Sequence, residues 1–502
     1  MNVNVIVMSE AGKPIFARRG MEEDIARLCG LCQAIRTSVM GNKAFHLGEI
    51  QSLWSGRLSM VFMSVGAITL VAIARAEENG VIETEAFLRL QLEYVFAQLI
   101  FTLTEQVQSV FQHNPGFDLR SMLTSSDNLI HGILDDCGPY GSAGPFLVSG
   151  VQTVFPITNS VRERASRILQ TIGDKTENTA FALLVVGDRL LSLVQPAFRA
   201  LQIRVSDLHL ILNFVSRQPG LYSSELWIPM CLPRFNSSGF LYAYTQCLDL
   251  TTKLSLILIS PVNTTEQFQI FRRAAELIRV QLGLPASYDS ILRIINSSNN
   301  SSDGEGRRSD ADVEWTRSES NSLDDDYVEI TGDGERMIPR NGTEECTLLQ
   351  ELKQIDNPST IDRIVKDCLD EDSIIHFLFR IDIPVKNCSR HKNSGKGTLT
   401  QCICPPIPFP FLDGPSKRRI WSCYQKMSLR LRLGSATVES AMDAFDMISL
   451  DEAGDREGSF PGIAKYCPAI GLMESPPNIE RVTYTLEDTE IFMAMNGRDF
   501  EL

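Results

Sequence analysis

Strand-like and helix-like hydrophobic patterns alternate along this chain, and the order in which they alternate occurs twice. In residues 1–140, apolar residues at every second position predict strands, and apolar residues three and four apart predict helices. The predicted elements are strands at Val3–Met8, Ile15–Arg18, Arg57–Ser64 and Ala67–Arg75, an optional strand at Glu49–Trp54, and helices at Met21–Met40 and Thr84–Val110. This order predicts an α+β unit built on a small sheet.

The second unit, residues 179–295, repeats the order with little shared sequence. Its predicted elements are strands at Thr179–Gly187, Leu190–Gln195, Leu226–Leu232, Phe240–Asp249 and Lys253–Ser260, and helices at Ser206–Arg217 and Glu266–Leu282. Between the units, residues 141–178 form a connecting segment with a helix at Ser160–Ile172. Repetition of element order therefore predicts two domains of the same fold.

A change of composition separates these units from the rest of the chain. Residues 296–346 are rich in serine, asparagine and acidic residues, which predicts a disordered linker. A third unit, residues 347–502, has predicted strands at Ile374–Val385, Arg481–Leu486 and Glu490–Met495, a helix at Ser416–Gly434 and an irregular insert at residues 435–478. No closing helix follows its last strands, so the third unit is expected to be incomplete.

Charge and hydrophobicity exclude several classes of protein. The 502 residues carry a formal net charge of -15, which argues against nucleic-acid binding because that would need a basic surface. The first residues lack the basic and continuous apolar regions of a signal peptide, and no uncharged apolar run reaches about 18 residues. The twelve cysteines are spread along the chain and are expected to be buried thiols, not disulfides. These features predict a soluble protein of a reducing compartment.

Motifs that would indicate an enzyme or a metal protein are absent from the sequence. We find no glycine-rich phosphate loop and no serine-nucleophile motif. One cysteine and histidine group has a spacing that fits no standard zinc finger: Cys388, His391, Cys402 and Cys404. We therefore expect no catalytic residues, no metal and no cofactor.

The helix predicted at Met21–Met40 has a wider apolar stripe than one sheet face requires. Its apolar positions include Ile25, Leu28, Cys32 and Ile35, and Cys29, Leu31 and Ala34 widen the stripe. Two interpretations are open. The helix is either sunk deeply into its own domain or also contacts a partner, since apolar surface beyond the needs of a core marks interfaces.

Several segments resemble the SAND family of vacuolar-fusion proteins, the Mon-type subunit of the Mon/Ccz exchange complex. They are SEAGKPIFARRG at 9–20, QLEYVFAQLIFTLT at 91–104, FALLVVGDRLLSLVQP at 181–196 and, most specifically, ELWIPMCLPRFNSSGFLYAY at 225–244. Looser matches are KRRIWSCYQKMSLRLR at 417–432 and ERVTYTLEDTEIFMAMNGRDFEL at 480–502. The resemblance covers both N-terminal units well and the third in pieces.

The resemblance implies three longin-like domains of β-β-α-β-β-β-α order, the third of them incomplete here. It further implies a heterodimer with a Ccz-type longin subunit that acts as a guanine-nucleotide exchange factor for a late-endosomal Rab GTPase. Such a protein would be cytoplasmic and recruited to phosphoinositide-containing late-endosomal and vacuolar or lysosomal membranes, for endosome maturation, vacuole fusion and autophagy. Exchange requires preferential binding of the nucleotide-poor GTPase, not covalent chemistry. The rival interpretation is a longin-type trafficking adaptor or tether without exchange activity.

Three groups of residues are candidates for function under this resemblance. The partner or GTPase interface is expected at Lys13, Arg18, Ile25, Leu28, Cys32 and Ile35. The family signature is Trp227, Pro229, Asn236, Gly239, Phe240 and Tyr244, with Trp227 and Phe240 expected as core anchors; its role is either structural or in an interface. A lipid-binding patch is expected at Lys417, Arg418, Arg419 and Arg430, although these residues also fit an ordinary solvated helix face.

Overall fold

We describe the fold from a computed structural model of the chain. It describes residues 3–40, 49–76, 83–114, 117–123, 126–137, 146, 150–154, 157–196, 201–284, 347–354, 379–385, 397–403, 421–422, 424–425, 479–487, 490–497 and 500–501. The predicted acidic linker (296–346) and the predicted insert (435–478) lie outside these residues.

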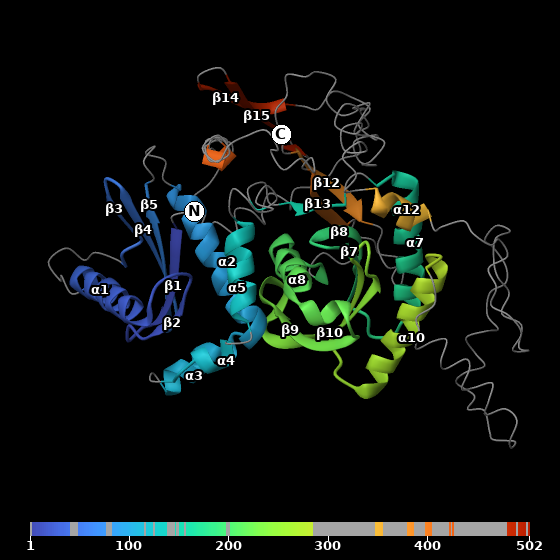
Figure 1. The fold of residues 1–502 in the computed structure, drawn as a ribbon, viewed down its shortest axis with the longest axis horizontal. Helices are drawn as coiled ribbons and strands as arrows, with labels where there is room; N and C mark the ends of the chain where they lie inside the picture. Colours follow the sequence, from blue (N-terminus) through green and yellow to red (C-terminus); the bar gives the residue numbers. More distant parts are fainter. Residues whose placement is uncertain are drawn as a thin grey trace, which may run out of the picture.

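The first domain is a five-stranded antiparallel sheet between two helices, in strand order β2-β1-β5-β4-β3 (Figure 1). Its strands are β1 (Val3–Ser9), β2 (Pro14–Ala17), β3 (Ser52–Ser55), β4 (Leu58–Val65) and β5 (Ile68–Arg75), and its covering helices are α1 (Glu22–Met40) and α2 (Glu85–Leu103). Alternation along β1 divides the sheet into two faces, because successive side chains point to opposite sides. Ile6 and Met8 pack under α1, whereas Val5 and Val7 pack under α2.

The second domain repeats this arrangement with strand order β8-β7-β11-β10-β9. Its strands are β7 (Phe181–Val186), β8 (Arg189–Val194), β9 (Leu226–Leu232), β10 (Ser237–Asp249) and β11 (Leu254–Ser260). Helix α8 (Val205–Arg217) covers one face, and α7 (Asn159–Lys175) and α10 (Thr265–Gln281) cover the other. Two short elements, η2 (Pro219–Tyr222) and α9 (Pro233–Asn236), flank β9. The helix predicted in the connecting segment is thus part of the second domain's outer layer.

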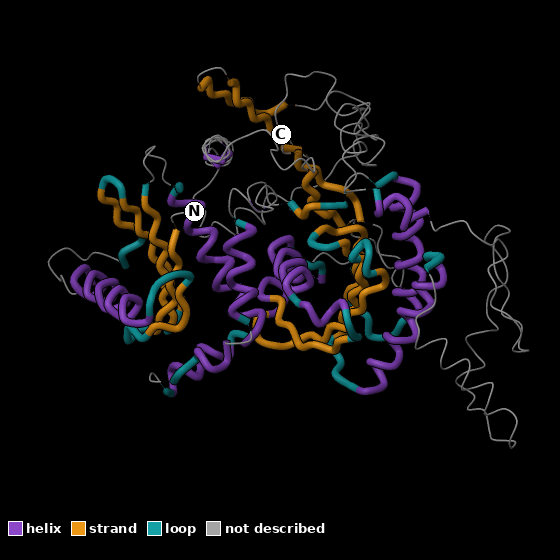
Figure 2. The backbone as a smooth tube through the Cα atoms, viewed as in Figure 1, coloured by secondary structure: helices purple, strands orange, loops and turns teal. Residues whose placement is uncertain are grey.

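Helix α2 lies between the two sheets and belongs to both cores (Figures 1 and 2). Leu88, Leu92 and Val95 pack on the first sheet, while Phe87 and Tyr94 pack in the core that contains α8 and the second sheet. A helix that is apolar around its whole circumference is buried on all sides, and each fully buried large side chain contributes roughly 1.5–3 kcal/mol before opposing terms. The two domains therefore share one continuous interior.

By length and composition, α2 is the one helix of the described residues that could cross a membrane. In the fold, 67% of its 18-residue apolar window is buried within the protein. The contacts of α2 with both sheets account for this apolar composition.

The single helix predicted at Thr84–Val110 is divided in two. Helix α2 ends at Leu103, Thr104 adopts a φ of 61°, and α3 (Gln106–His113) begins beyond it. A positive φ is uncommon for a threonine and ends the helical hydrogen-bond ladder. The break is fixed from the second domain, because Glu105 N–H donates to the Ser237 carbonyl at 2.9 Å. Helices α4 (Arg120–Leu123) and α5 (Asp127–Asp136) follow, and α5 packs against α2 and α8.

A third sheet includes strands from the C-terminal region and one strand from the connecting segment. Its order is β14-β15-β16-β12-β13-β6. The strands are β6 (Val151–Gln152), β12 (Phe379–Val385), β13 (Gly397–Ile403), β14 (Ile479–Glu487), β15 (Glu490–Gly497) and β16 (Phe500–Glu501), and a short helix, α12 (Thr347–Lys353), precedes them. Because β6 pairs with β13 in parallel, the connecting segment belongs partly to this sheet.

Candidate partner-binding surface

Helix α1 is attached to the outer face of the first sheet by its inner residues. Cys29 and Cys32 are buried there, in a cluster with Ile6, Met8, Met60, Phe62, Val71 and Ile73. Arg36 is also buried, and its Nη1 donates to Thr69 Oγ1 on β5 at 2.8 Å. The acidic residues Glu22, Glu23 and Asp24 occupy the first turn, where their negative charges interact favourably with the positive end of the helix dipole. These contacts fix which side of α1 faces outward.

The outward side of α1 carries small residues beside exposed apolar ones. Ala26, Gly30 and Ala34 are exposed at four-residue spacing, so they form a flat strip. Leu31 beside the strip is 55% exposed, and Met21 just before the helix is 75% exposed. Among the described residues, no element covers this side, and α1 forms the outermost layer of the molecule (Figure 1).

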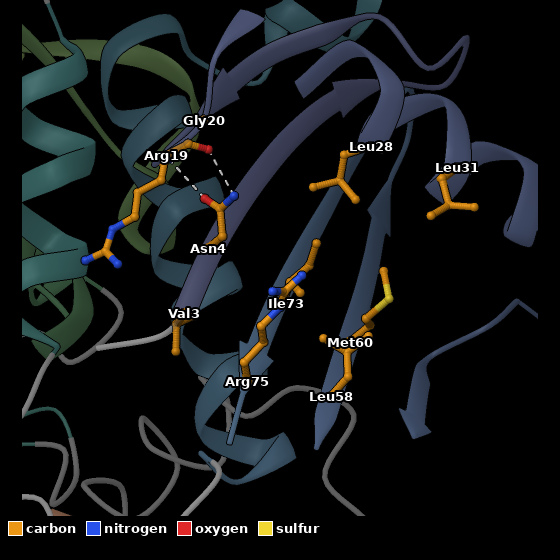
Figure 3. Close-up of a pocket in the computed structure, with 10 residues that line it drawn as sticks. All are labelled: Val3, Asn4, Arg19, Gly20, Leu28, Leu31, Leu58, Met60, Ile73 and Arg75. Atoms are coloured by element: carbon orange, nitrogen blue, oxygen red, sulfur yellow. Dashed lines mark hydrogen bonds between the residues drawn. The ribbon is translucent and has the colours of Figure 1, made fainter. Parts of the chain in front are cut away.

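A groove of about 420 Å³ opens beside α1, where the helix does not cover the ends of the strands (Figure 3). The strand register places Asn4, Ile73 and Met60 side by side across its floor, because Asn4 pairs with Ile73 and Ile73 pairs with Met60. Leu28 and Leu31 of α1 line one wall. The other lining residues are Val3, Arg19, Gly20, Leu58 and Arg75.

The end of the groove is held by a side-chain to backbone pair. Asn4 Nδ2 donates to the Arg19 carbonyl, and Arg19 N–H donates to Asn4 Oδ1, both at 3.0 Å (Figure 3). Gly20 follows with a φ of 127°, a conformation that glycine adopts most readily. A Cβ at this position would also lie 3.1 Å from Ile25 Cγ1. The turn from β2 into α1 therefore fixes the position of α1, which forms one wall of the groove.

The expected interface residues are not all on this surface. Cys32 is fully buried. Ile25, Leu28 and Ile35 are half-buried on the side of α1 that faces the sheet, and Leu28 also lines the groove. Arg18 points to α5, where its Nη2 lies 2.6 Å from Asp135 Oδ1 and its side chain is 7% exposed. Lys13 Nζ lies 3.6 Å from Asp118 Oδ2.

Five exposed large apolar residues of this domain were not among the predicted site residues: Met21, Leu31, Trp54, Val110 and Met122. Leu31 did widen the predicted apolar stripe of the helix. Trp54, on the edge strand β3, is 72% exposed. An aromatic residue at the end of the optional strand predicted at Glu49–Trp54 is the signal that could have found it.

The paired thiols of α1 are not suited to chemistry. Burial, together with the neighbouring Cys29, raises the pKa of Cys32 to about 11, and burial also raises the pKa of Cys29. A thiol with a raised pKa stays protonated near neutral pH and is a poor nucleophile. Of the five cysteines whose side chains are described, four are buried, Cys247 is half-buried, and all five are free.

The signature segment forms the β9–β10 hairpin of the second domain. Tyr244 is fully buried, and Trp227 packs on the same core while its Nε1 donates to Asn263 Oδ1 at 2.9 Å. Trp227 also stacks on Tyr242, with ring centroids 6.1 Å apart. Pro229 is exposed, and Phe240, expected as a core anchor, is 37% exposed.

The turn of this hairpin joins the two domains. Buried Asp207 of α8 accepts hydrogen bonds from the backbone N–H groups of Arg234 and Phe235 at 3.2 and 3.0 Å. Asn236 Oδ1 accepts from Ser238 N–H at 3.1 Å, and Gly239 follows at the start of β10. Cys231 packs into the core of the first domain. Together with the hydrogen bond from Glu105 N–H to the Ser237 carbonyl, the packing of Cys231 gives this part of the signature a structural position between the domains.

The remaining candidates are mostly outside the described residues. Lys417, Arg418, Arg419 and Arg430 are outside them, as are Cys388, His391 and Cys404. Part of the helix predicted at Ser416–Gly434 is seen as helical residues 421–422 and 424–425. Within the part of the chain that is described, no group of three or more metal-ligating side chains occurs.

Both N-terminal domains match longin families. The family described as "First Longin domain of FUZ, MON1 and HPS1" matches residues 3–133, and "Second Longin domain of FUZ, MON1 and HPS1" matches residues 177–275. The fold thus defines a longin-domain protein, which confirms the predicted α+β class.

Curated relatives narrow this class. The chain is 34% identical to "Protein SAND" of Takifugu rubripes over 262 residues, which is 51% of this chain and 46% of that protein. It is 32% identical to "Vacuolar fusion protein MON1 homolog A" of Gallus gallus (51% and 44%), and 33% identical to "Vacuolar fusion protein MON1 homolog" of Oryza sativa subsp. japonica (50% and 41%). The chain belongs to the SAND/MON1 family, as its residues predicted. The matched region spans less than half the length of these relatives.

Proposed function

We propose that this protein is a vesicle-trafficking regulator that acts in vacuolar fusion as the Mon-type subunit of a guanine-nucleotide exchange complex. In this proposal, it pairs with a Ccz-type longin subunit, and the pair activates a late-endosomal Rab GTPase. Support comes from its family and from the names of its relatives. The activity resides in a shared surface, because exchange depends on a preference for the nucleotide-poor GTPase and needs no nucleophile.

The observation that carries this proposal is the outward side of α1, which no element of the described residues covers. Its strip of Ala26, Gly30 and Ala34 allows another backbone to approach closely, as small residues do at helix contacts. The groove beside it is lined mainly by apolar side chains and offers Leu31 as an anchor at its rim. A flat strip next to an apolar hollow is the kind of surface that buries aliphatic or aromatic anchors of a partner.

The test is to co-express the chain with a Ccz-type subunit and replace Leu31 by Asp. We expect recovery of the pair in a pull-down to fall by about tenfold or more, because a carboxylate would be desolvated at the contact. Leu250→Asp is the matched control, since Leu250 is 64% exposed in the second domain. Unchanged pairing of Leu31→Asp would remove α1 from the interface.

Exchange itself is tested by release of a fluorescent nucleotide from late-endosomal Rabs, with and without the partner subunit. Acceleration that requires both chains supports the proposal. If the pair forms but accelerates release from none of these Rabs, the protein is a longin-type adaptor or tether.

The proposal includes recruitment to phosphoinositide-containing membrane through Lys417, Arg418, Arg419 and Arg430. Each basic residue near an anionic surface contributes roughly 1 kcal/mol. The double variant Lys417→Glu/Arg419→Glu should therefore float less with phosphoinositide liposomes than the unmodified protein. Equal flotation of the two proteins would contradict a lipid role for this patch.

A further inference from the structure

Three segments of the C-terminal region contact the two longin domains at separate places. The first is α12, which follows the acidic stretch in the sequence. Its three leucines, Leu348, Leu349 and Leu352, are buried in the core beneath α7 and α10. That same core contains Leu282 and Leu284, the last described residues before the acidic stretch. The two described ends of residues 285–346 therefore lie on one face of the second domain.

Helix α12 also binds the start of α7 through a carboxylate. Glu351 accepts two hydrogen bonds from Thr158, one from its backbone N–H and one from its hydroxyl, both at 2.7 Å. Thr158 is the N-cap residue of α7, where backbone N–H groups lack partners within the helix. A negative charge at this end of a helix is favoured by the helix dipole, and charged hydrogen bonds are stronger than neutral ones.

The second contact has the same design at the start of α2. Thr84 is the N-cap residue of α2, and both its N–H and its hydroxyl donate to Gln425 Oε1 at 3.2 Å. Gln425 Nε2 in turn donates to Glu83. One turn away, Trp421 is 7% exposed and meets Phe87 edge to face, with ring centroids 5.3 Å apart. An apolar anchor and a polar side chain thus again hold a helix start.

The third contact is a strand pair. Val151 and Gln152 in β6 pair in parallel with Gln401 and Cys402 in β13. The next residue, Thr153, forms a parallel bridge to Leu190 in β8. Three consecutive residues of the connecting segment therefore link the third sheet to the second domain's sheet.

We propose that α12, β13 and residues 421–422 and 424–425 form a clamp that holds the C-terminal region on the two longin domains without a covalent tether through residues 285–346. Residues 285–346 then connect two points on the same face of the second domain. The clamp is independent of the proposed exchange function. It predicts that the chain can be cut within this stretch and remain one particle.

The experiment inserts a recognition sequence for a site-specific protease between Ser318 and Glu319 of the full chain. After complete cleavage, we expect both fragments to co-elute in one peak during gel filtration at low micromolar concentration under native conditions. Separation of the fragments under these conditions would overturn the proposal.

Two sets of variants then test whether the named residues form the clamp. Leu349→Asp combined with Trp421→Ala should raise the dissociation constant of the cleaved fragments by about tenfold or more, because it removes both buried anchors. Leu277→Asp is the matched control, since Leu277 is 40% exposed on α10. The uncleaved double variant should keep the elution volume of the unmodified protein, which checks its folding. An unchanged dissociation constant for the cleaved double variant would assign the association to other contacts and overturn the clamp.

Discussion

Helices α1 and α8 occupy the same position in their domains, after the second strand and against one face of the sheet. Among the described residues, however, only α8 is covered on both sides. Every residue of α8 from Val205 to Val215 is buried, because α2 and α5 of the first domain pack over it. Helix α1 exposes Ala26, Gly30, Leu31 and Ala34 on its outer side. The same position in the fold therefore forms the contact between the domains in the second domain and an exposed surface in the first.

The polar residues of the two helices follow this difference. His209 Nε2 donates to the Gly150 carbonyl at 2.9 Å, so its Nδ1 accepts from the Tyr94 hydroxyl at 2.7 Å. Asn213 Nδ2 donates to Gln98 Oε1 and to the Leu129 carbonyl, at 3.0 and 2.9 Å. On α1, by contrast, Arg27 forms only loose pairs with Glu23 and Asp24 at 3.9 and 3.8 Å. A covered longin helix is recognised by buried polar groups that reach another domain.

The largest test of this contrast removes an apolar side chain from each helix. Phe214 of α8 is buried, and its ring centroid lies 6.0 Å from that of Phe101 in α2. Phe214→Ala should lower the free energy of unfolding by about 3–5 kcal/mol, because it leaves a cavity between the domains. Leu31→Ala on α1 should change it by about 0.5 kcal/mol or less. Urea denaturation measures both, and a similar loss for the two variants would contradict the comparison.

A second prediction uses pH. Burial lowers the pKa of His209 to about 4, below the value of about 6.5 expected in the unfolded chain. The neutral ring therefore stabilises the fold above about pH 6.5, and this contribution is lost as the pH falls towards 4. The loss should reach about 3 kcal/mol.

The variant His209→Gln should lose less stability over this range, since glutamine does not titrate. Urea denaturation at several pH values for both proteins gives the difference. Parallel pH dependence in the two proteins would show that His209 does not have to stay neutral in the fold.

The smallest prediction compares two glycines and expects opposite signs. A Cβ at Gly132 of α5 would overlap Asn213 Oδ1 and lie 2.9 Å from Arg217 Nε, so Gly132→Ala should destabilise the protein by about 1–3 kcal/mol. A Cβ at Gly30 of α1 would meet no atom within 4 Å. Gly30→Ala should therefore stabilise the protein by about 0.5–1 kcal/mol through helix propensity. Thermal unfolding followed by circular dichroism distinguishes the signs, and destabilisation by Gly30→Ala would mean that α1 is covered.

Much of the fold could be predicted from local patterns, because strand alternation and helix periodicity depend on neighbouring residues. Strands β9 and β5 were placed within about one residue, and α8 likewise. The break at Thr104 could not be predicted, since the contact that fixes it comes from Ser237 of the other domain. The orientation of Arg18 likewise depends on Asp135, which lies 117 residues away in the sequence.

The candidate site was predicted mainly at the level of its helix, with Leu28 as the one predicted interface residue that also lines the groove. An apolar stripe identifies α1 as a surface element but does not show which side of the stripe the sheet covers. Cys32 was therefore included although it is buried, whereas Leu31 was not. The groove depends on where α1 ends relative to the strands, and Asn4, Met60 and Ile73 come together only through strand register.

The double role of α2 affects how this protein is synthesised. When residues 1–103 have left the ribosome, the first domain can cover only one side of that helix. Phe87, Tyr94 and Phe101 must wait for residues such as Ile257 and Ile259 of β11 to complete their core. At ordinary translation rates this wait lasts roughly ten seconds or more, during which a row of aromatic side chains stays open to chaperones or to wrong contacts.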